Sequence, residues 1–148
     1  MEKILLSAVA VLGTLIALKF KGVYHKAISI GLTISVLLVW TENKYLITGG
    51  FITISLLTIA TFVYGLTVKK LNNFEKVSVT TMGLFLVVNS IFKLMHYPFA
   101  GLIKLSMIIP VIIALTTFIK GRKLTKEMSF MLFWLFYATS EVLKIWIY

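Results

Sequence analysis

Six long apolar stretches, separated by short charged loops, decide what this chain can fold into. A helix needs about 20 residues to cross the hydrocarbon core of a bilayer, and roughly 17–25 are tolerated. The last four stretches have this length, and the first two reach it if they extend into the loop at residues 19–26, whose lysines can snorkel to the interface. The stretches are residues 4–18, 27–40, 45–68, 77–95, 99–119 and 128–147.

The composition excludes the other protein classes. Hydrophobic residues make up 59% of the chain and charged residues only 14%, whereas soluble domains have about 45–50% and about 25%. The absence of Cys excludes a disulfide scaffold, and stretches that are apolar all round do not fit the alternating strands of an outer-membrane barrel. We therefore expect an all-α polytopic membrane protein. Residues 1–148 should form a single transmembrane domain of six transmembrane helices, arranged as three helical hairpins at about 1–44, 45–96 and 97–148.

The basic residues predict the orientation of the chain. Most of the 15 Lys and Arg residues fall in the first, third and fifth loops, namely Lys19, Lys21, Lys26, Lys69, Lys70, Lys76, Lys120, Arg122, Lys123 and Lys126. Positive charge in short loops marks the cytoplasmic side. The prediction is a bacterial inner-membrane protein with cytoplasmic basic loops and periplasmic termini. The net charge of +10 is then explained by contact with anionic headgroups rather than by nucleic-acid binding.

The second half of the chain contains a modest internal repeat. Placing Gly50 against Gly101 aligns the third and fourth stretches with the fifth and sixth without a gap, so that Lys69 meets Lys120 and Lys93 meets Lys144. Such a parallel repeat differs from the inverted repeats common in secondary transporters. Within the stretches, Gly13, Gly31, Gly65 and Gly83 could let helices approach closely, and Pro110 should kink the fifth stretch.

Ionisable side chains inside membrane spans are costly and mark candidate functional sites. Asn89, Lys93 and His96 follow one another at helical spacing in the fourth stretch, which predicts a polar stripe on its outer half. In the fifth and sixth stretches, Lys104 and Glu141 should lie at a similar depth, with Lys144 one turn beyond Glu141. We expect Glu141 to form an ion pair with either Lys104 or Lys93.

Three interpretations of this intramembrane polar cluster remain open. Polar pairs can simply hold membrane helices together, Glu141 with Lys93 and His96 could handle protons or ions, or the cluster could bind a ligand. His96 and His25 fall on opposite sides of the membrane, so neither a haem nor a metal site is expected. The sequence contains no Walker loop, nucleophile elbow or metalloprotease motif and no Asp. An enzyme and a bound cofactor are therefore the least favoured expectations.

Residues 91–98 read IFKLMHYP. This segment resembles the Phe-Lys-x-Met-His-Trp-Pro signature of GldL-type subunits of the gliding-motility and type IX secretion motor. The matching residues are Phe92, Lys93, Met95, His96 and Pro98, while Tyr97 replaces Trp and Phe99 replaces the usual Gly. The resemblance covers residues 87–119, roughly a fifth of the chain, and residues 142–148 (VLKIWIY) look like a degenerate second copy.

The resemblance has consequences for topology and for two residues. In that family the motif ends the first membrane helix and turns into the second on the periplasmic side, which is the side that the charges predict. Its Lys and His belong to an intramembrane polar network, which implies the same role for Lys93 and His96. The family's second helix also carries an essential Glu, whereas the fifth stretch here has Lys104 as its only charge. The resemblance thus implies a relative of the hairpin rather than a motor subunit.

Two function classes follow from these observations. The small size, short loops and lack of a soluble domain favour a non-catalytic subunit that docks to partner membrane proteins, in an envelope, secretion or motility complex, or to copies of itself. The alternative is a small channel or transporter that handles protons or ions through the cluster of Asn89, Lys93, His96, Lys104, Glu141 and Lys144. A cavity opening outward at the cluster would favour this alternative.

Overall fold

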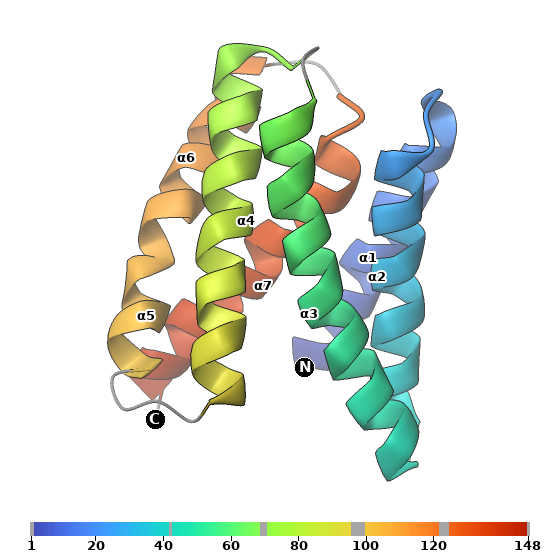
Figure 1. Ribbon diagram of the computed structural model, residues 1–148, viewed down its shortest axis with the longest axis vertical. Helices are drawn as coiled ribbons and strands as arrows, with labels where there is room; N and C mark the ends of the chain where they lie inside the picture. The colour runs from blue at the N-terminus through green and yellow to red at the C-terminus, as the bar shows by residue number, and fades with distance from the viewer. Residues whose placement is uncertain (1, 42, 69–70, 96–99, 122–124, 148) are drawn as a thin grey trace.

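The computed structural model of the protein describes residues 2–41, 43–68, 71–95, 100–121 and 125–147. Every regular element in these residues is a helix, which confirms the expected all-α class. Their arrangement is shown in Figure 1. The helices are α1 (Glu2–Lys19), α2 (Tyr24–Trp40), α3 (Lys44–Thr67), α4 (Asn73–Leu94), α5 (Ala100–Ser106), α6 (Ile108–Gly121) and α7 (Met128–Ile147).

The lengths of these helices match a membrane environment. Four helical stretches are long and apolar enough to cross a bilayer, namely Lys44–Thr67, Asn73–Leu94, Gly101–Gly121 and Met128–Ile145. The helix Tyr24–Trp40 is apolar but shorter. Five of the predicted stretches therefore coincide with one helix each, the fifth coincides with α5 and α6 together, and the third to sixth have spanning length.

Helix α7 lies at the centre of the bundle. It packs against α1, α2, α4, α5 and α6, and in Figure 1 it crosses obliquely behind α3 and α4. Its apolar window is 44% buried, against 17–33% for the other three spanning stretches. The large side chains Phe130, Phe133 and Trp134 are almost completely buried and form the aromatic layer of the core.

Successive helices run in opposite directions, with α5 and α6 taken as one stretch, so the start of α1 and the end of α7 lie toward the same end of the bundle (Figure 1). We call this the terminal end. It also contains the end of α2, the start of α3, the end of α4 and the start of α5. The opposite end contains the ends of α1, α3 and α6 and the starts of α2, α4 and α7. We call it the basic end, because the basic loops of the sequence connect these helices.

Glycines allow the closest helix contacts, as small residues do in membrane proteins. A Cβ atom on Gly13 of α1 would collide with the backbone carbonyl of Ser129 on α7. On the α3–α4 pair, a Cβ on Gly83 would lie 2.5 Å from the Cα of Phe62, and one on Gly65 would meet the backbone of Thr80. Because these glycines have no side chain, the backbones of neighbouring helices pack in direct contact at these positions.

Side-chain hydroxyl groups also form hydrogen bonds between helices. The Thr33 side chain donates to the backbone oxygen of Ala10 at 3.0 Å, and Ser29 donates to Ser129 at 3.1 Å, which joins α2 to α1 and α7. The indole Nε1 of Trp134 donates to Thr61 on α3 at 2.9 Å. Because lipid offers no competing partners for these groups, such bonds favour one arrangement of the helices.

Pro110 explains why the fifth stretch is divided into α5 and α6. A proline lacks the N–H that would bond to the carbonyl four residues earlier, and its ring crowds that carbonyl. The carbonyl concerned belongs to Ser106, the last residue of α5. The next residue, Met107, donates its N–H to the carbonyl of Lys104, three residues earlier, at 3.1 Å. The helix resumes at Ile108. The disruption that the sequence predicts at Pro110 thus falls one turn earlier.

Candidate functional site

Glu141 is the centre of a charged cluster at the terminal end. Its side chain is only 2% exposed, and Oε2 lies 2.7 Å from Nζ of Lys93. Lys93 lies in the last turn of α4, and Glu141 lies about two turns before the end of α7. The two helices thus place one buried carboxylate against a lysine whose side chain is still 36% exposed.

Two further groups on α7 complete this cluster. Lys144, one turn after Glu141, donates to Glu141 Oε1 at 3.1 Å. Lys93 donates to the hydroxyl of Tyr137 at 3.1 Å, and its Nζ also lies 5.3 Å from the centre of the Tyr137 ring. We refer to Lys93, Tyr137, Glu141 and Lys144 as the Glu141 cluster. Oε1 of the carboxylate accepts a hydrogen bond from Lys144 and Oε2 forms an ion pair with Lys93, so each oxygen has a cation in contact.

A cavity of about 230 Å³ adjoins the Glu141 cluster. All four cluster residues line it, together with Lys3 from the first turns of α1. The remaining lining residues are mostly apolar and aromatic: Leu6, Val36, Val39, Trp40, Phe51, Ile54 and Phe133. Because Lys3, Trp40 and Phe51 are exposed, the cavity reaches the surface of the protein. We call it the terminal cavity.

The described residues that line the terminal cavity carry more positive than negative charge. Lys3, Lys93 and Lys144 contribute three positive charges, and Glu141 contributes one negative charge. Two of these lysines are held by Glu141. An apolar wall makes surplus positive charge costly unless an anion or water shares the site.

The residues selected from the sequence do not all belong to this cluster. Lys93, Glu141 and Lys144 meet in it, and of the two partners left open for Glu141 the structure supplies Lys93. Lys104 lies half-buried on α5, and within the described residues its side chain forms no hydrogen bond or ion pair. Asn89 is 1% exposed on α4, one turn before Lys93, and its Nδ2 has no hydrogen-bond partner among those residues. His96 lies outside them.

Tyr137 is a member of the cluster that sequence reasoning missed. It precedes Glu141 by one helical turn, so the spacing of four residues could have placed both on the same face of α7. An uncharged tyrosine in the middle of an apolar helix such as α7 would ordinarily be assigned to the apolar core. The hydroxyl of Tyr137 instead points to Lys93 inside the bundle.

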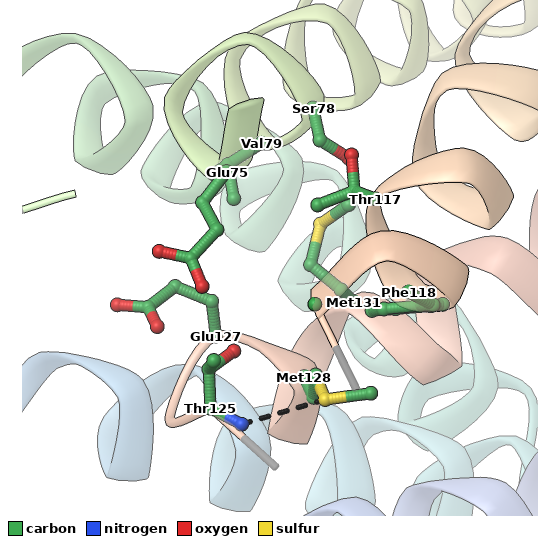
Figure 2. Close-up of a pocket in the computed structure, with 10 residues that line it drawn as sticks. Glu75, Ser78, Val79, Thr117, Phe118, Thr125, Glu127, Met128 and Met131 are labelled. Carbon is green, nitrogen blue, oxygen red and sulfur yellow. Dashed lines mark hydrogen bonds between the residues drawn. The ribbon is translucent and has the colours of Figure 1, made fainter. Parts of the chain in front are cut away.

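A second polar cluster, at the basic end, was also missed by the sequence. Glu127, just before α7, is 4% exposed and accepts a hydrogen bond from the Tyr64 hydroxyl at 3.0 Å. Lys126 Nζ lies 3.6 Å from the same Glu127 oxygen. Figure 2 shows the side chains of Glu75 and Glu127 next to each other in a small pocket, which has a volume of about 20 Å³ and room for about one water molecule. Glu141 was the acidic residue selected from the sequence, whereas the structure buries both Glu141 and Glu127.

His25 also differs in position from the expectation. The sequence placed it in a loop, whereas it lies in the first turn of α2 with 2% exposure. Its Nε2 lies 3.3 Å from the carbonyl oxygen of Ala17, near the end of α1. The contact fixes the turn between these helices, where Gly22 adopts a φ of 137° that favours glycine.

The two polar clusters are separated by the aromatic layer of the core. Phe130, Phe133 and Trp134 are fully or almost fully buried between Glu127 and Glu141 on α7. Phe133 and Trp134 contact each other edge to face, with ring centres 5.2 Å apart. A packed layer of this kind does not favour a continuous polar path between the two ends of the bundle.

The described residues contain no group of three or more His, Cys, Asp or Glu side chains that could hold a metal ion. Comparison of the chain with protein-family models, with curated proteins and with solved structures returned no match. The geometry of the two clusters and of the terminal cavity therefore carries the functional argument.

Proposed function

We propose that this protein is a non-catalytic subunit of the bacterial inner membrane, with six membrane spans and periplasmic termini, that docks to another membrane protein through the face of α5 that carries Lys104. The six spans are α1, α2, α3, α4, the α5–α6 stretch and α7. In this proposal α1 and α2, which are shorter than the other spans, cross with their flanking lysines at the interfaces.

The observation that carries the proposal is the contrast between Lys104 and the other charged residues of the spans. Lys93 and Lys144 each form an ion pair with Glu141 within the chain. Lys104 lies inside the apolar stretch Gly101–Gly121, and it has no such partner in the described part of the chain. A charge in a span normally pairs with another group, so an acidic residue of a neighbouring protein is the proposed partner of Lys104.

The surroundings of Lys104 suit a helix contact. Gly101, one turn earlier on α5, is exposed, and a Cβ atom there would meet nothing within 4 Å. Leu102 and Leu105 are also exposed. A small residue beside a cation and exposed leucines allows another helix to approach closely and pack around the ion pair. The resemblance of residues 91–98 to the GldL hairpin, which works inside an assembly of membrane proteins, is consistent with such a role.

Affinity purification tests the docking proposal. A tagged chain expressed at its native level is extracted in mild detergent, and the proteins recovered with it are identified by mass spectrometry. We expect one membrane protein in a fixed ratio, and its loss with Lys104→Met but not with the control Lys44→Met, which changes an exposed lysine at the start of α3. Recovery of the chain alone, as a monomer, would contradict the proposal.

The terminal cavity favours a second candidate, namely transport of protons or ions through the Glu141 cluster. The cavity brings the surface of the protein to Lys93 and Glu141. The aromatic layer beneath it counts against a complete path. Flux of protons or ions into liposomes that contain the pure protein, abolished by Glu141→Gln, would favour transport over docking alone.

A further inference from the structure

We propose that the terminal cavity is a binding site for the phosphate group of an anionic membrane lipid. The proposal rests on the membrane placement given above, but it needs no protein partner. The chemistry that the site would recognise is a phosphate with a net negative charge. The cavity walls distinguish a lipid headgroup from a free phosphate ion.

The first argument is charge. Lys3, Lys93 and Lys144 line the cavity with a single carboxylate, that of Glu141. Glu141 contacts Lys93 at 2.7 Å and Lys144 at 3.1 Å, and with Lys3 the described lining residues carry three lysines against this one carboxylate. A phosphate with one negative charge would accept hydrogen bonds from lysine ammonium groups and lower the cost of that surplus.

The second argument is the position of the cavity along the helices. Lys3 lies near the start of α1, Trp40 is the last residue of α2, and Lys93 lies in the last turn of α4. Lys144 lies in the last turn of α7. All four residues therefore lie near one end of the bundle, which corresponds to a membrane interface in the proposed placement. Lipid phosphates lie at this level, and lysines near helix ends reach them readily.

The third argument is the size and lining of the cavity. Its volume of about 230 Å³ is several times the share of about 30 Å³ that one water molecule takes in the liquid. Its apolar lining includes Leu6, Val36 and Ile54, together with the exposed side chains of Phe51 and Trp40. These walls would contact the glycerol and the first acyl carbons of a lipid, whereas a free phosphate ion would leave them unused.

Trp40 is held in place at the opening. Its indole Nε1 donates to the Ser7 hydroxyl on α1 at 2.7 Å, which joins the end of α2 to the first turns of α1 beside Lys3. Tryptophan is enriched at membrane interfaces because its ring is apolar and its N–H is polar. The opening is therefore bordered by a fixed aromatic ring and a lysine, which together suit the junction of a headgroup and an acyl chain.

Lipid binding to the pure protein tests the proposal. The delipidated chain in detergent is titrated with phosphatidylglycerol, and bound lipid is counted by native mass spectrometry. We expect one tightly bound molecule, with about fivefold weaker binding for Lys3→Gln and for Lys144→Gln, since each lysine near an anionic headgroup contributes on this scale. Lys44→Gln is the matched control, because Lys44 is exposed at the same end of the bundle but does not line the cavity.

Lys3→Gln is the decisive variant because Lys3 is exposed and forms no salt bridge with Glu141, so its loss should not disturb the Glu141 cluster. Equal binding by Lys3→Gln, Lys144→Gln and Lys44→Gln would overturn the proposal, as would equal binding of zwitterionic phosphatidylcholine. A third arm adds sodium phosphate to the complex. Displacement of the lipid by millimolar phosphate would assign the site to a free anion and overturn the lipid assignment.

Discussion

The carboxylate of Glu141 on α7 lies 2.7 Å from the ammonium group of Lys93 on α4, in a cluster that also includes Lys144 and Tyr137. This contact fixes the end of the central helix against α4 at the terminal end of the bundle. It also gives the buried carboxylate, whose side chain is 2% exposed, a cation in contact. Lys104, within the stretch Gly101–Gly121, has no such ion pair among the described residues, and the docking proposal gives it a partner in a neighbouring protein.

Removal of the Glu141 charge should destabilise the bundle. In Glu141→Gln, Lys93 and Lys144 lose their counterion and repel each other. Breaking a fully buried pair costs about 3–5 kcal/mol, and because both lysines are more than one third exposed we expect about 1–3 kcal/mol here. Thermal unfolding in detergent measures the loss. The double variant Lys93→Met with Glu141→Gln should recover part of it, and strictly additive effects would show that the two groups do not interact.

Gly13 should tolerate no side chain. A Cβ in Gly13→Ala would collide with the backbone of Ser129 and push α1 away from α7, at a cost of about 1–3 kcal/mol. Gly49→Ala is the matched control, since a Cβ there meets nothing within 4 Å and alanine favours the helix. The melting temperature should fall for the first variant only. An equal effect of the two substitutions would mean that α1 and α7 are not in close contact.

The Trp134–Thr61 hydrogen bond should contribute measurably to the packing of α7 against α3. Thr61→Val keeps the shape of the side chain but leaves the buried indole N–H without an acceptor, which costs about 1–3 kcal/mol. The thermal midpoint in detergent reports the change. Thr48→Val on the exposed part of the same helix is the control, because the Thr48 hydroxyl bonds only to the backbone of Lys44. Indistinguishable melting of the two variants would contradict this bond.

The orientation of the chain can be measured by cysteine labelling, since the sequence contains no Cys. Single cysteines at Lys21, in the α1–α2 connection, and at Asn43, just before α3, both occupy exposed positions. In whole cells a membrane-impermeant maleimide should label Asn43→Cys, whereas Lys21→Cys should react only after the membrane is permeabilised. Labelling of both from outside, or the reverse pattern, would refute periplasmic termini.

Much of the fold follows from the sequence because apolar length is a strong signal. The third to sixth stretches correspond to helices of spanning length, and their bounds agree to within a few residues. The close contacts of Gly13, Gly65 and Gly83 were also foreseeable from residue size. The central position of α7 was not, since which helix is surrounded by the others depends on contacts between distant parts of the chain.

Most residues of the candidate site could be predicted from the sequence, but the ion pairs between them could not. Helical spacing brought Lys93, Glu141 and Lys144 into consideration, yet depth alone could not decide between Lys93 and Lys104 as the partner of Glu141. That choice depends on how α4, α5 and α7 rotate about their axes. The same rotation brings Tyr137 to Lys93, which the sequence did not reveal. Glu127 was missed for another reason, since it precedes α7 and resembled a loop residue.

The most direct measurement of the docking proposal is photo-crosslinking in native membranes from position 101, one turn before Lys104. A photoreactive amino acid at Gly101 points into open space and leaves Lys104 intact, and the same residue at Gly49 on α3 serves as the control. The account predicts a covalent adduct with one membrane protein from position 101, absent from position 49 and lost when Lys104→Met is added. Adducts with lipid only, or the same adducts from both positions, would contradict it.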